Sequence, residues 1–265
     1  MDLRPLGRTG IDVSPLALGT VKLGRNQGVR YPRAFDIPDD RAAAALLALA
    51  AELGINTLDT APAYGESEER LGLLLSSQRD RWVICTKAGE TFDGAESTFD
   101  FSDASISASV ERSLRRLRTD RVDIALVHCP DADERTLRET PALGALRRLQ
   151  EQGKVRAVGA STKTPSGAAF AAEHCDVVML AYNPVDDASA PAIDRAASLG
   201  VGVLVKKALL SGHLPPGAED PVERCLRFAF ARPGVSAVVV GTIDPRHLEH
   251  DADAARRALR AAPNP

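Results

Sequence analysis

The stretch LGTVKLGRNQG, residues 18–28, follows the first short apolar run that is typical of a buried strand. An open, doubly wound sheet that binds a dinucleotide normally carries a glycine-rich turn, G-x-G-x-x-G, directly after its first strand. Glycines are needed in that turn because the backbone must approach a pyrophosphate closely. Residues 18–28 lack the G-x-G-x-x-G fingerprint. The segment therefore favours a closed arrangement of parallel strands over an open sheet.

Short apolar runs and longer amphipathic runs alternate from this point to the end of the chain. Such alternation is typical of parallel strands joined by crossover helices. Eight runs are candidate strands, and they span residues 16–19, 57–59, 83–86, 123–128, 155–159, 177–182, 201–206 and 237–240. Because this number closes a barrel with a filled interior, the sequence predicts an α/β fold of the (β/α)8 TIM-barrel class.

The amphipathic runs predict helices over residues 39–53, 66–76, 103–117, 137–151, 165–173, 188–198, 221–232 and 245–259. Glycine after Leu53 and after Leu199 supplies a left-handed helix stop, and Ser102 supplies a capping start. Ahead of the first strand, Gly7 and Gly10 predict a small N-terminal β-hairpin that closes the bottom of the barrel. No linker or repeat beyond the βα rhythm interrupts the chain, so we expect a single domain over residues 1–265.

Size, charge and hydropathy limit the classes of protein to which the chain can belong. Its 265 residues, 44% of them hydrophobic, suit one large domain. A net charge of −3 and a pI near 6.0 argue against nucleic acid as the main partner. The chain has no apolar signal-peptide core and no stretch of about 18 apolar residues. We therefore expect a cytoplasmic monomer or small homo-oligomer that acts on a small molecule and has no membrane partner.

The cysteine and histidine spacing does not indicate a metal site. The 4 cysteines are far apart and form no C-x-x-C pair, which argues against both a zinc site and a disulfide scaffold. His247 and His250 have a spacing that a helix could use for a metal, but no third ligand lies near them in sequence. We expect reduced thiols and no bound metal.

Four polar side chains fall at or just after the ends of three neighbouring predicted strands: Asp59, Tyr64, Lys87 and His128. The carboxyl ends of barrel strands meet at one face, so these side chains can converge there. Each has an ordinary interpretation by itself, as a helix cap, a loop aromatic, a solvated lysine or a buried histidine. Together they supply what carbonyl reduction needs, since hydride added at carbon must be matched by a proton delivered to oxygen.

The combination predicts a role for each of these four residues. Tyrosine has a pKa of about 10, and a neighbouring ammonium group stabilises its phenolate. We therefore assign Tyr64 as the general acid or base and Lys87 as the cation that lowers its pKa. Asp59 would hold Lys87 charged and oriented, and His128 would donate a hydrogen bond to the substrate oxygen or relay its proton.

Six segments resemble the aldo-keto reductase family in their order and spacing. LDTAPAYGESEERLG (residues 58–72) is similar to the family's D-T-A-x-x-Y-G signature. VICTKAG (83–89) resembles the strand with the catalytic lysine, and RVDIALVHCPD (121–131) the strand that ends in the catalytic histidine. GKVRAVGAST (153–162), LGRTGIDVSPLALGT (6–20) and GVSAVVVGTIDPRHLEH (234–250) also fit. The resemblance covers nearly the whole chain and implies NADPH or NADH lying extended across the barrel mouth, without a metal.

The resemblance also implies which residues contact the cofactor. Ser161 matches the serine at the nicotinamide amide. Leu209 and Ser211 lie in the loop that holds the pyrophosphate, and Gly241 and Thr242 open the loop at the adenosine phosphate. The remaining matching positions are Gly19, Thr20 and Asp59.

Several cofactor positions depart from the family pattern. Thr162 stands where asparagine is usual, Met179 where glutamine is usual, and Lys206 where an aromatic residue is usual, with Lys207 following it. His250 replaces a glutamate at the adenine. A lost amide hydrogen bond weakens binding by roughly 0.5–1.5 kcal/mol without abolishing it. Because Arg246 or His247 could reach a 2′-phosphate, we expect NADPH rather than NADH.

Two other functions remain open at this point. A Schiff-base lyase would use a barrel lysine, for which Lys87, Lys206 and Lys207 are candidates. A nucleotide-binding redox sensor or regulatory subunit with little turnover would explain the departures at the cofactor positions. We expect the segments over residues 24–38 and 89–103 to complete the pocket for a small carbonyl substrate.

Overall fold

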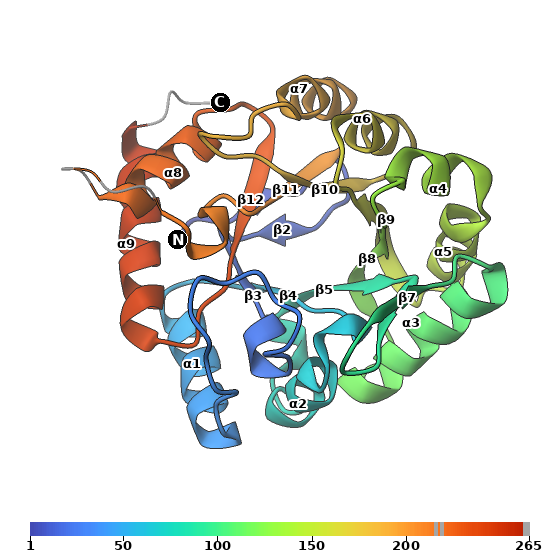
Figure 1. Ribbon diagram of the computed structural model, residues 1–265, viewed down its shortest axis with the longest axis horizontal. Coiled ribbons are helices and arrows are strands. Elements are labelled where there is room, and N and C mark those ends of the chain that lie inside the picture. The colour runs from blue at the N-terminus through green and yellow to red at the C-terminus, as the bar shows by residue number, and fades with distance from the viewer. Residues whose placement is uncertain (215–216, 218–219, 262–265) are drawn as a thin grey trace.

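The eight predicted strands form a closed, parallel barrel, as seen in the computed structural model, which describes residues 1–214, 217 and 220–261 (Figure 1). The strands are β3 (Leu16–Gly19), β4 (Thr57–Asp59), β5 (Val83–Ala88), β8 (Val122–His128), β9 (Val155–Ser161), β10 (Val177–Ala181), β11 (Gly202–Lys206) and β12 (Val235–Val240). Around the barrel they follow the order β10-β11-β12-β3-β4-β5-β8-β9. The (β/α)8 prediction is confirmed.

Helices cover the outside of the barrel (Figure 1). They are α1 (Asp40–Glu52), α2 (Ser67–Leu74), α3 (Asp103–Leu117), α4 (Asp133–Glu139), α5 (Ala142–Glu151), α6 (Pro165–His174), α7 (Ala190–Leu199), α8 (Pro221–Phe230) and α9 (Pro245–Ala261). Short 3-10 turns occur at η1 (Val21–Leu23), η2 (Pro62–Tyr64), η3 (Arg79–Arg81) and η4 (Leu210–Gly212). Within the described ranges, none of the helices is long and apolar enough to cross a membrane.

The single helix predicted over residues 137–151 is wrong. The structure has two helices there, α4 and α5, which are separated at Thr140 and Pro141. Thr140 has an extended backbone with ψ of 158°, as expected for a residue that precedes proline. Pro141 then lies at the N-terminus of α5, where its missing N–H costs no helical hydrogen bond.

The N-terminal hairpin, β1 (Arg4–Pro5) with β2 (Asp12–Val13), closes the bottom of the barrel as predicted. Leu6, Ile11 and Val13 are at most 1% exposed and pack against the apolar side chains that fill the barrel. A side-chain carbon at Gly202, where β11 begins, would lie only 2.6 Å from Leu6. Glycine at that position therefore leaves room for the leucine to fill the end of the barrel.

A second hairpin, β6 (Glu90–Phe92) with β7 (Ser97–Phe99), lies at the opposite end of the barrel, and the sequence patterns predict only a loop there. It follows β5 directly through Gly89, whose φ is 105°. A side-chain carbon at Gly89 would lie 2.4 Å from the Phe101 ring. The guanidinium of Arg25 lies 3.3 Å from the centre of the Phe92 ring, so residues 24–38 and the hairpin meet over the barrel mouth.

We expect Leu6→Ala to lower the free energy of unfolding by about 2–5 kcal/mol, because it leaves a cavity at the bottom of the barrel. Leu3→Ala is the matched control, since Leu3 directly precedes β1 and is 52% exposed, and should change stability by about 0.5 kcal/mol or less. Urea denaturation of both variants measures the difference. Equal stabilities would contradict the closing role of the hairpin.

Candidate active site

The carboxyl ends of β4 and β5 bring three of the predicted polar residues into direct contact. Lys87 Nζ donates hydrogen bonds to Asp59 Oδ1 at 2.5 Å, to the Thr60 carbonyl at 2.9 Å and to the Tyr64 hydroxyl at 3.0 Å. Asp59 lies beside Cys85 in the strand register. Lys87, two residues further along β5, shares the inner face with Cys85 because side chains alternate along a strand. The Lys87 side chain is only 1% exposed.

The turn η2 places the Tyr64 ring against the lysine. It follows β4 and reverses the chain so that Lys87 Nζ lies 4.5 Å from the centre of the Tyr64 ring. Gly65 ends this turn with φ of 60°, and a side-chain carbon there would lie 2.1 Å from the Gly24 carbonyl oxygen. The close approach to Gly24 therefore explains why glycine follows Tyr64 in the sequence.

A buried hydroxyl network holds the elements beneath the site together. Thr20 Oγ1 donates to the Asp59 carbonyl at 2.9 Å, and Ser67 Oγ donates to Thr20 Oγ1 at 2.7 Å. Thr20 is fully buried, and the network joins β3, β4 and α2. The structure thus uses this hydroxyl internally, and the cofactor contact expected for Thr20 stays a prediction.

Burial and charge set the protonation states of Lys87 and Tyr64. Burial alone would lower the pKa of Lys87, but Asp59, together with Tyr64 and Cys85, outweighs burial and the net pKa is raised. Burial and the Asp59 charge raise the pKa of Tyr64, and the opposing effect of Lys87 is smaller. The expected net acidification of Tyr64 is therefore wrong. At neutral pH the phenol is protonated, which is the form that donates a proton.

His128, at the end of β8, joins the other three residues. The Tyr64 and His128 rings meet edge to face, with 6.3 Å between their centres. Burial lowers the pKa of His128, and this effect outweighs the opposing influence of Glu90. Glu90 Oε2 lies 2.7 Å from His128 Nδ1. Burial alone would raise the pKa of Glu90, but His128, Ser97 and Arg25 outweigh it and lower the pKa to about 2.

Sequence reasoning did not single out Glu90. The residue directly follows Gly89 in a polar stretch that looks like a loop, and only the pairing of β6 with β7 brings its carboxylate to His128. The one available signal was its place three residues after Lys87, near the end of a barrel strand.

Lys206 and Ser161 meet at the ends of β11 and β9. Lys206 Nζ donates a hydrogen bond to Ser161 Oγ at 2.9 Å. Burial, followed by the positive charges of Lys207 and Lys87, lowers the pKa of Lys206 to about 7. A substantial share of this side chain is therefore an uncharged amine near neutral pH.

Met179 and Thr162 lie within the barrel beside this pair. Both are 1% exposed, and Met179 belongs to the apolar cluster that fills the barrel interior. Thr162 Oγ1 donates to the Met179 carbonyl at 3.3 Å. Their contacts with a cofactor stay predictions, because the structure engages both side chains with other parts of the chain.

The loop after β11 has an unusual backbone. Lys207, Leu210 and Ser211 have φ of 57°, 50° and 55°, in the left-handed region that non-glycine residues rarely adopt. Such strain costs on the order of 1–3 kcal/mol for each residue and clusters at ligand sites. Leu209 belongs to the same loop. In α/β barrels, the loops after the last two strands commonly form a phosphate site.

The loop between β12 and α9 completes this side of the mouth. Asp244 N–H donates to Thr242 Oγ1 at 3.1 Å, just ahead of the N-terminus of α9. Side-chain carbons at Gly19 and Gly241 would lie 3.1 Å from Val239 and 3.2 Å from the Tyr31 hydroxyl. The glycines keep the backbone close to the mouth, and a helix N-terminus favours phosphate. Together with the two lysines, these groups fit a phosphate-bearing cofactor.

The two histidines of α9 differ in their surroundings. The His247 side chain is 72% exposed and lies near the helix start. His250 Nε2 lies 2.9 Å from Asp220 Oδ2 and is thus engaged with a carboxylate of the chain. His247 is the freer of the two to meet a ligand.

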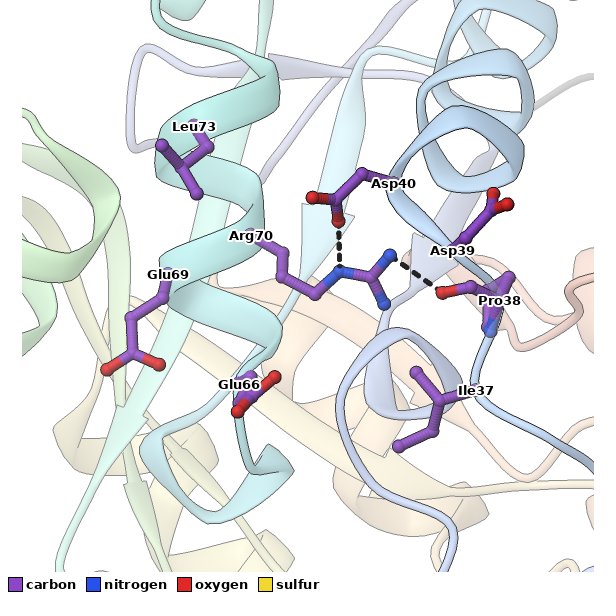
Figure 2. Close-up of a pocket in the computed structure, with 8 residues that line it drawn as sticks. All are labelled: Ile37, Pro38, Asp39, Asp40, Glu66, Glu69, Arg70 and Leu73. Atoms are coloured by element: carbon purple, nitrogen blue, oxygen red, sulfur yellow. Dashed lines mark hydrogen bonds and ion pairs between the residues drawn. The ribbon is translucent and has the colours of Figure 1, made fainter.

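A pocket of about 440 Å³ lies elsewhere, between α1 and α2 (Figure 2). Figure 2 shows the Arg70 guanidinium reaching across this space, with hydrogen bonds to Asp40 Oδ1 at 2.8 Å and to the Pro38 carbonyl at 2.7 Å. The lining contains none of the four predicted catalytic residues. The pocket therefore belongs to the packing of two outer helices.

Residues 15–221 match the family model described as the aldo/keto reductase family. The chain belongs to the aldo-keto reductase family. The barrel that carries the site is the aldo-keto reductase barrel.

Several known aldo-keto reductases and related oxidoreductases are similar to the chain. L-galactose dehydrogenase of Arabidopsis thaliana is 36% identical over 166 residues, which cover 60% of this chain and 48% of that protein. D-threo-aldose 1-dehydrogenase of a Pseudomonas species is 28% identical over 251 residues, which cover 84% of this chain and 73% of that protein. The matches to L-galactose dehydrogenase and to two Bacillus subtilis proteins span only 47–50% of those relatives, about half their length.

Solved structures support the same family. A Pseudomonas aeruginosa protein assigned to the aldo-keto reductases is 48% identical, with a TM-score of 0.88 and coverage of 97% of this chain and 95% of that one. An aldo-keto reductase of Bacillus halodurans has a TM-score of 0.78 at 22% identity, which shows the fold alone.

We expect Lys87→Met to make stability depend on pH. Without the ammonium group, folding buries the Asp59 carboxylate unpaired, so the variant takes up a proton when it folds. Its free energy of unfolding should fall relative to wild type between about pH 4 and pH 7, by about 1.4 kcal/mol for each pH unit over which the proton is taken up.

The control is Asp59→Asn combined with Lys87→Met, which removes both charges and should not show this pH dependence. Urea denaturation across the pH range measures it. A constant difference between Lys87→Met and wild type would contradict the pairing.

Proposed function

We propose that the protein reduces small aldehydes or ketones to alcohols with NADPH, or with NADH as the alternative cofactor. The observation that carries the proposal is the triple contact of the buried Lys87 ammonium with Asp59, the Thr60 carbonyl and the Tyr64 hydroxyl. This arrangement fixes a protonated phenol beside a permanent cation. Such a group suits protonation of an alkoxide as it forms at a substrate carbon.

Each residue then has a separate task. Tyr64 donates its proton to the substrate oxygen, and Lys87 stabilises the phenolate that remains. Asp59 keeps Lys87 charged and oriented, and His128 contacts the substrate oxygen from the other side. When bound, the nicotinamide cofactor supplies the hydride that reaches the carbonyl carbon.

The protonation state of Tyr64 suits its proposed role as the proton donor. Burial and the Asp59 charge raise the pKa of Tyr64, so the phenol keeps its proton at neutral pH. A protonated phenol can donate to an alkoxide as it forms, and Lys87 would stabilise the phenolate that remains.

The residues at the mouth suggest how the cofactor is held. Ser161 would bind the nicotinamide amide, and Lys206 and Lys207 would lie near the pyrophosphate together with the strained loop that contains Leu209 and Ser211. Gly241 and Thr242 would lie near the adenosine phosphate. The exposed His247, and Arg246, which pairs with Asp244, lie at the start of α9 where they would meet a 2′-phosphate, and this favours NADPH over NADH.

The names of the relatives suggest a class of substrate. L-galactose, D-threo-aldose and D-arabinose dehydrogenases act on small polyhydroxylated carbonyl compounds or their cyclic forms, according to their names. Because these relatives are only 28–36% identical, we extend to this chain no more than a small, polar carbonyl substrate.

We expect Tyr64→Phe to lower kcat/KM for aldehyde reduction by at least about 100-fold, because the proton donor is lost. Its affinity for NADPH, measured by fluorescence titration, should stay unchanged. Tyr182→Phe is the matched control, since its ring packs against Phe228 and it should retain activity. Unchanged turnover in Tyr64→Phe would reject the assignment. Binding of NADPH by wild type without reduction of any aldehyde or ketone would instead favour the redox-sensor function.

The state of Lys206 favours Schiff-base chemistry as the second candidate function. Its pKa of about 7 leaves part of the side chain as a nucleophilic amine, whereas Asp59 keeps Lys87 charged. The amine nitrogen would add to a carbonyl carbon and water would leave, giving an imine. A lyase would use that imine as an electron sink, without a nicotinamide cofactor.

We expect borohydride and a small aldehyde to label Lys206 rather than Lys87, since borohydride delivers hydride to the imine carbon and leaves a stable secondary amine. Peptide mass spectrometry locates the adduct, and Lys206→Met should remove it. Labelling that stays on Lys87 would contradict the protonation states described above. Cleavage of a carbon–carbon bond without cofactor would be needed to establish the lyase.

A further inference from the structure

Glu90 and His128 form a second close pair of titratable groups at the barrel mouth. The carboxylate comes from β6 and the imidazole from the end of β8, with 2.7 Å between Glu90 Oε2 and His128 Nδ1. The side chains are 13% and 17% exposed. Ser97 Oγ donates to the other carboxylate oxygen, Oε1, at 2.6 Å. The hairpin therefore holds the carboxylate in a fixed position against the histidine.

The pair determines where a neutral imidazole carries its proton. His128 Nδ1 is buried and meets no full hydrogen-bond geometry among the residues that the structure describes, although Glu90 Oε2 lies only 2.7 Å from it. An unprotonated Nδ1 at this distance would be repelled by the negative carboxylate. A proton on Nδ1 is attracted to the same oxygen, so the carboxylate favours the Nδ1–H tautomer.

We infer that Glu90 is a positioning residue that keeps the proton on Nδ1 of His128 and leaves Nε2 as the nitrogen that meets the substrate. The inference rests on the proposed function, in which His128 contacts the substrate oxygen. Neutral Nε2 is a hydrogen-bond acceptor. It donates to a carbonyl oxygen only when His128 carries a second proton.

The charges around His128 oppose this second proton. Lys87 on β5 and Lys206 on β11 face the ring with positive charge, and Glu90 on β6 is the carboxylate that faces it, while Tyr64 on η2 is uncharged. Burial and the two lysines lower the pKa of His128, and Glu90 raises it by less. Glu90 is thus the group that keeps the doubly protonated, donating form of His128 accessible.

The pKa of His128 determines how the rate of reduction depends on pH. Reduction of a carbonyl compound is assisted by the protonated form of His128, so kcat/KM for reduction should rise as the pH falls through the pKa of this histidine. Removing the negative charge of Glu90 lowers that pKa. The rising limb of the pH profile then moves to lower pH.

The tautomer is tested by long-range proton–nitrogen NMR spectra of the cofactor-free, full-length chain, with His128 signals assigned by their loss in His128→Asn. We expect Nδ1 to carry the proton in wild type above the titration of His128. In Glu90→Gln the titration midpoint should fall by about one pH unit. Glu96→Gln, an exposed change on the same hairpin, should leave it unmoved. A proton on Nε2 in wild type, or an unchanged midpoint in Glu90→Gln, would overturn the inference.

The pH profile of aldehyde reduction gives the second readout. In Glu90→Gln the part of the profile where kcat/KM rises with falling pH should move to lower pH by about one unit. At a pH within that part, kcat/KM should be about tenfold lower than in wild type. A merely structural role for Glu90 would lower the profile without moving it, and that result would overturn the inference. Absence of reduction by wild type at any pH would instead refute the proposed function, and the NMR spectra would still decide the tautomer.

Discussion

The buried ammonium group of Lys87 is the constraint on which the site depends. An ion withdrawn from water costs several kcal/mol even after the protein relaxes, and only close oxygen atoms offset that cost. Here Asp59, the Thr60 carbonyl and Tyr64 supply those oxygens. They come from β4, the residue after it and the turn η2, so the strand register and the turn must both form before the lysine can be buried. The position of the phenol is therefore a consequence of how the charge is neutralised.

Most of the barrel could be predicted because its strands are buried on both faces. Such strands read as short apolar runs, and the bounds predicted for residues 16–19 and 57–59 match β3 and β4 residue for residue. The prediction failed over residues 137–151, where the apolar rhythm of α5 was extended backwards through Pro141. The proline itself marked the break, because the residue before proline avoids the helical region.

The site was harder to predict than the fold, and the reason differs between residues. Asp59, Lys87 and His128 lie at strand ends, and the resemblance to the aldo-keto reductases marks all of them together with Tyr64. Glu90 could not be identified in this way, because its contact with a histidine depends on a hairpin that folds back over the mouth. The net pKa of Tyr64 was also beyond sequence reasoning, since burial outweighs the neighbouring cation there and burial is a property of the complete fold.

Burial shifts the pKa values of Tyr64 and His128 in opposite directions. It favours the neutral form of each, which for Tyr64 is the protonated phenol and for His128 the deprotonated imidazole. Each group also has a carboxylate close by. The Lys87 ammonium lies between Asp59 and Tyr64 and bonds to both, whereas Glu90 contacts His128 directly. The phenol is thus held protonated, while burial favours the neutral imidazole and Glu90 opposes that effect. Tyr64 and His128 are buried at the same site, but each lies near a different carboxylate. The two neighbouring groups can therefore have distinct roles in moving a proton.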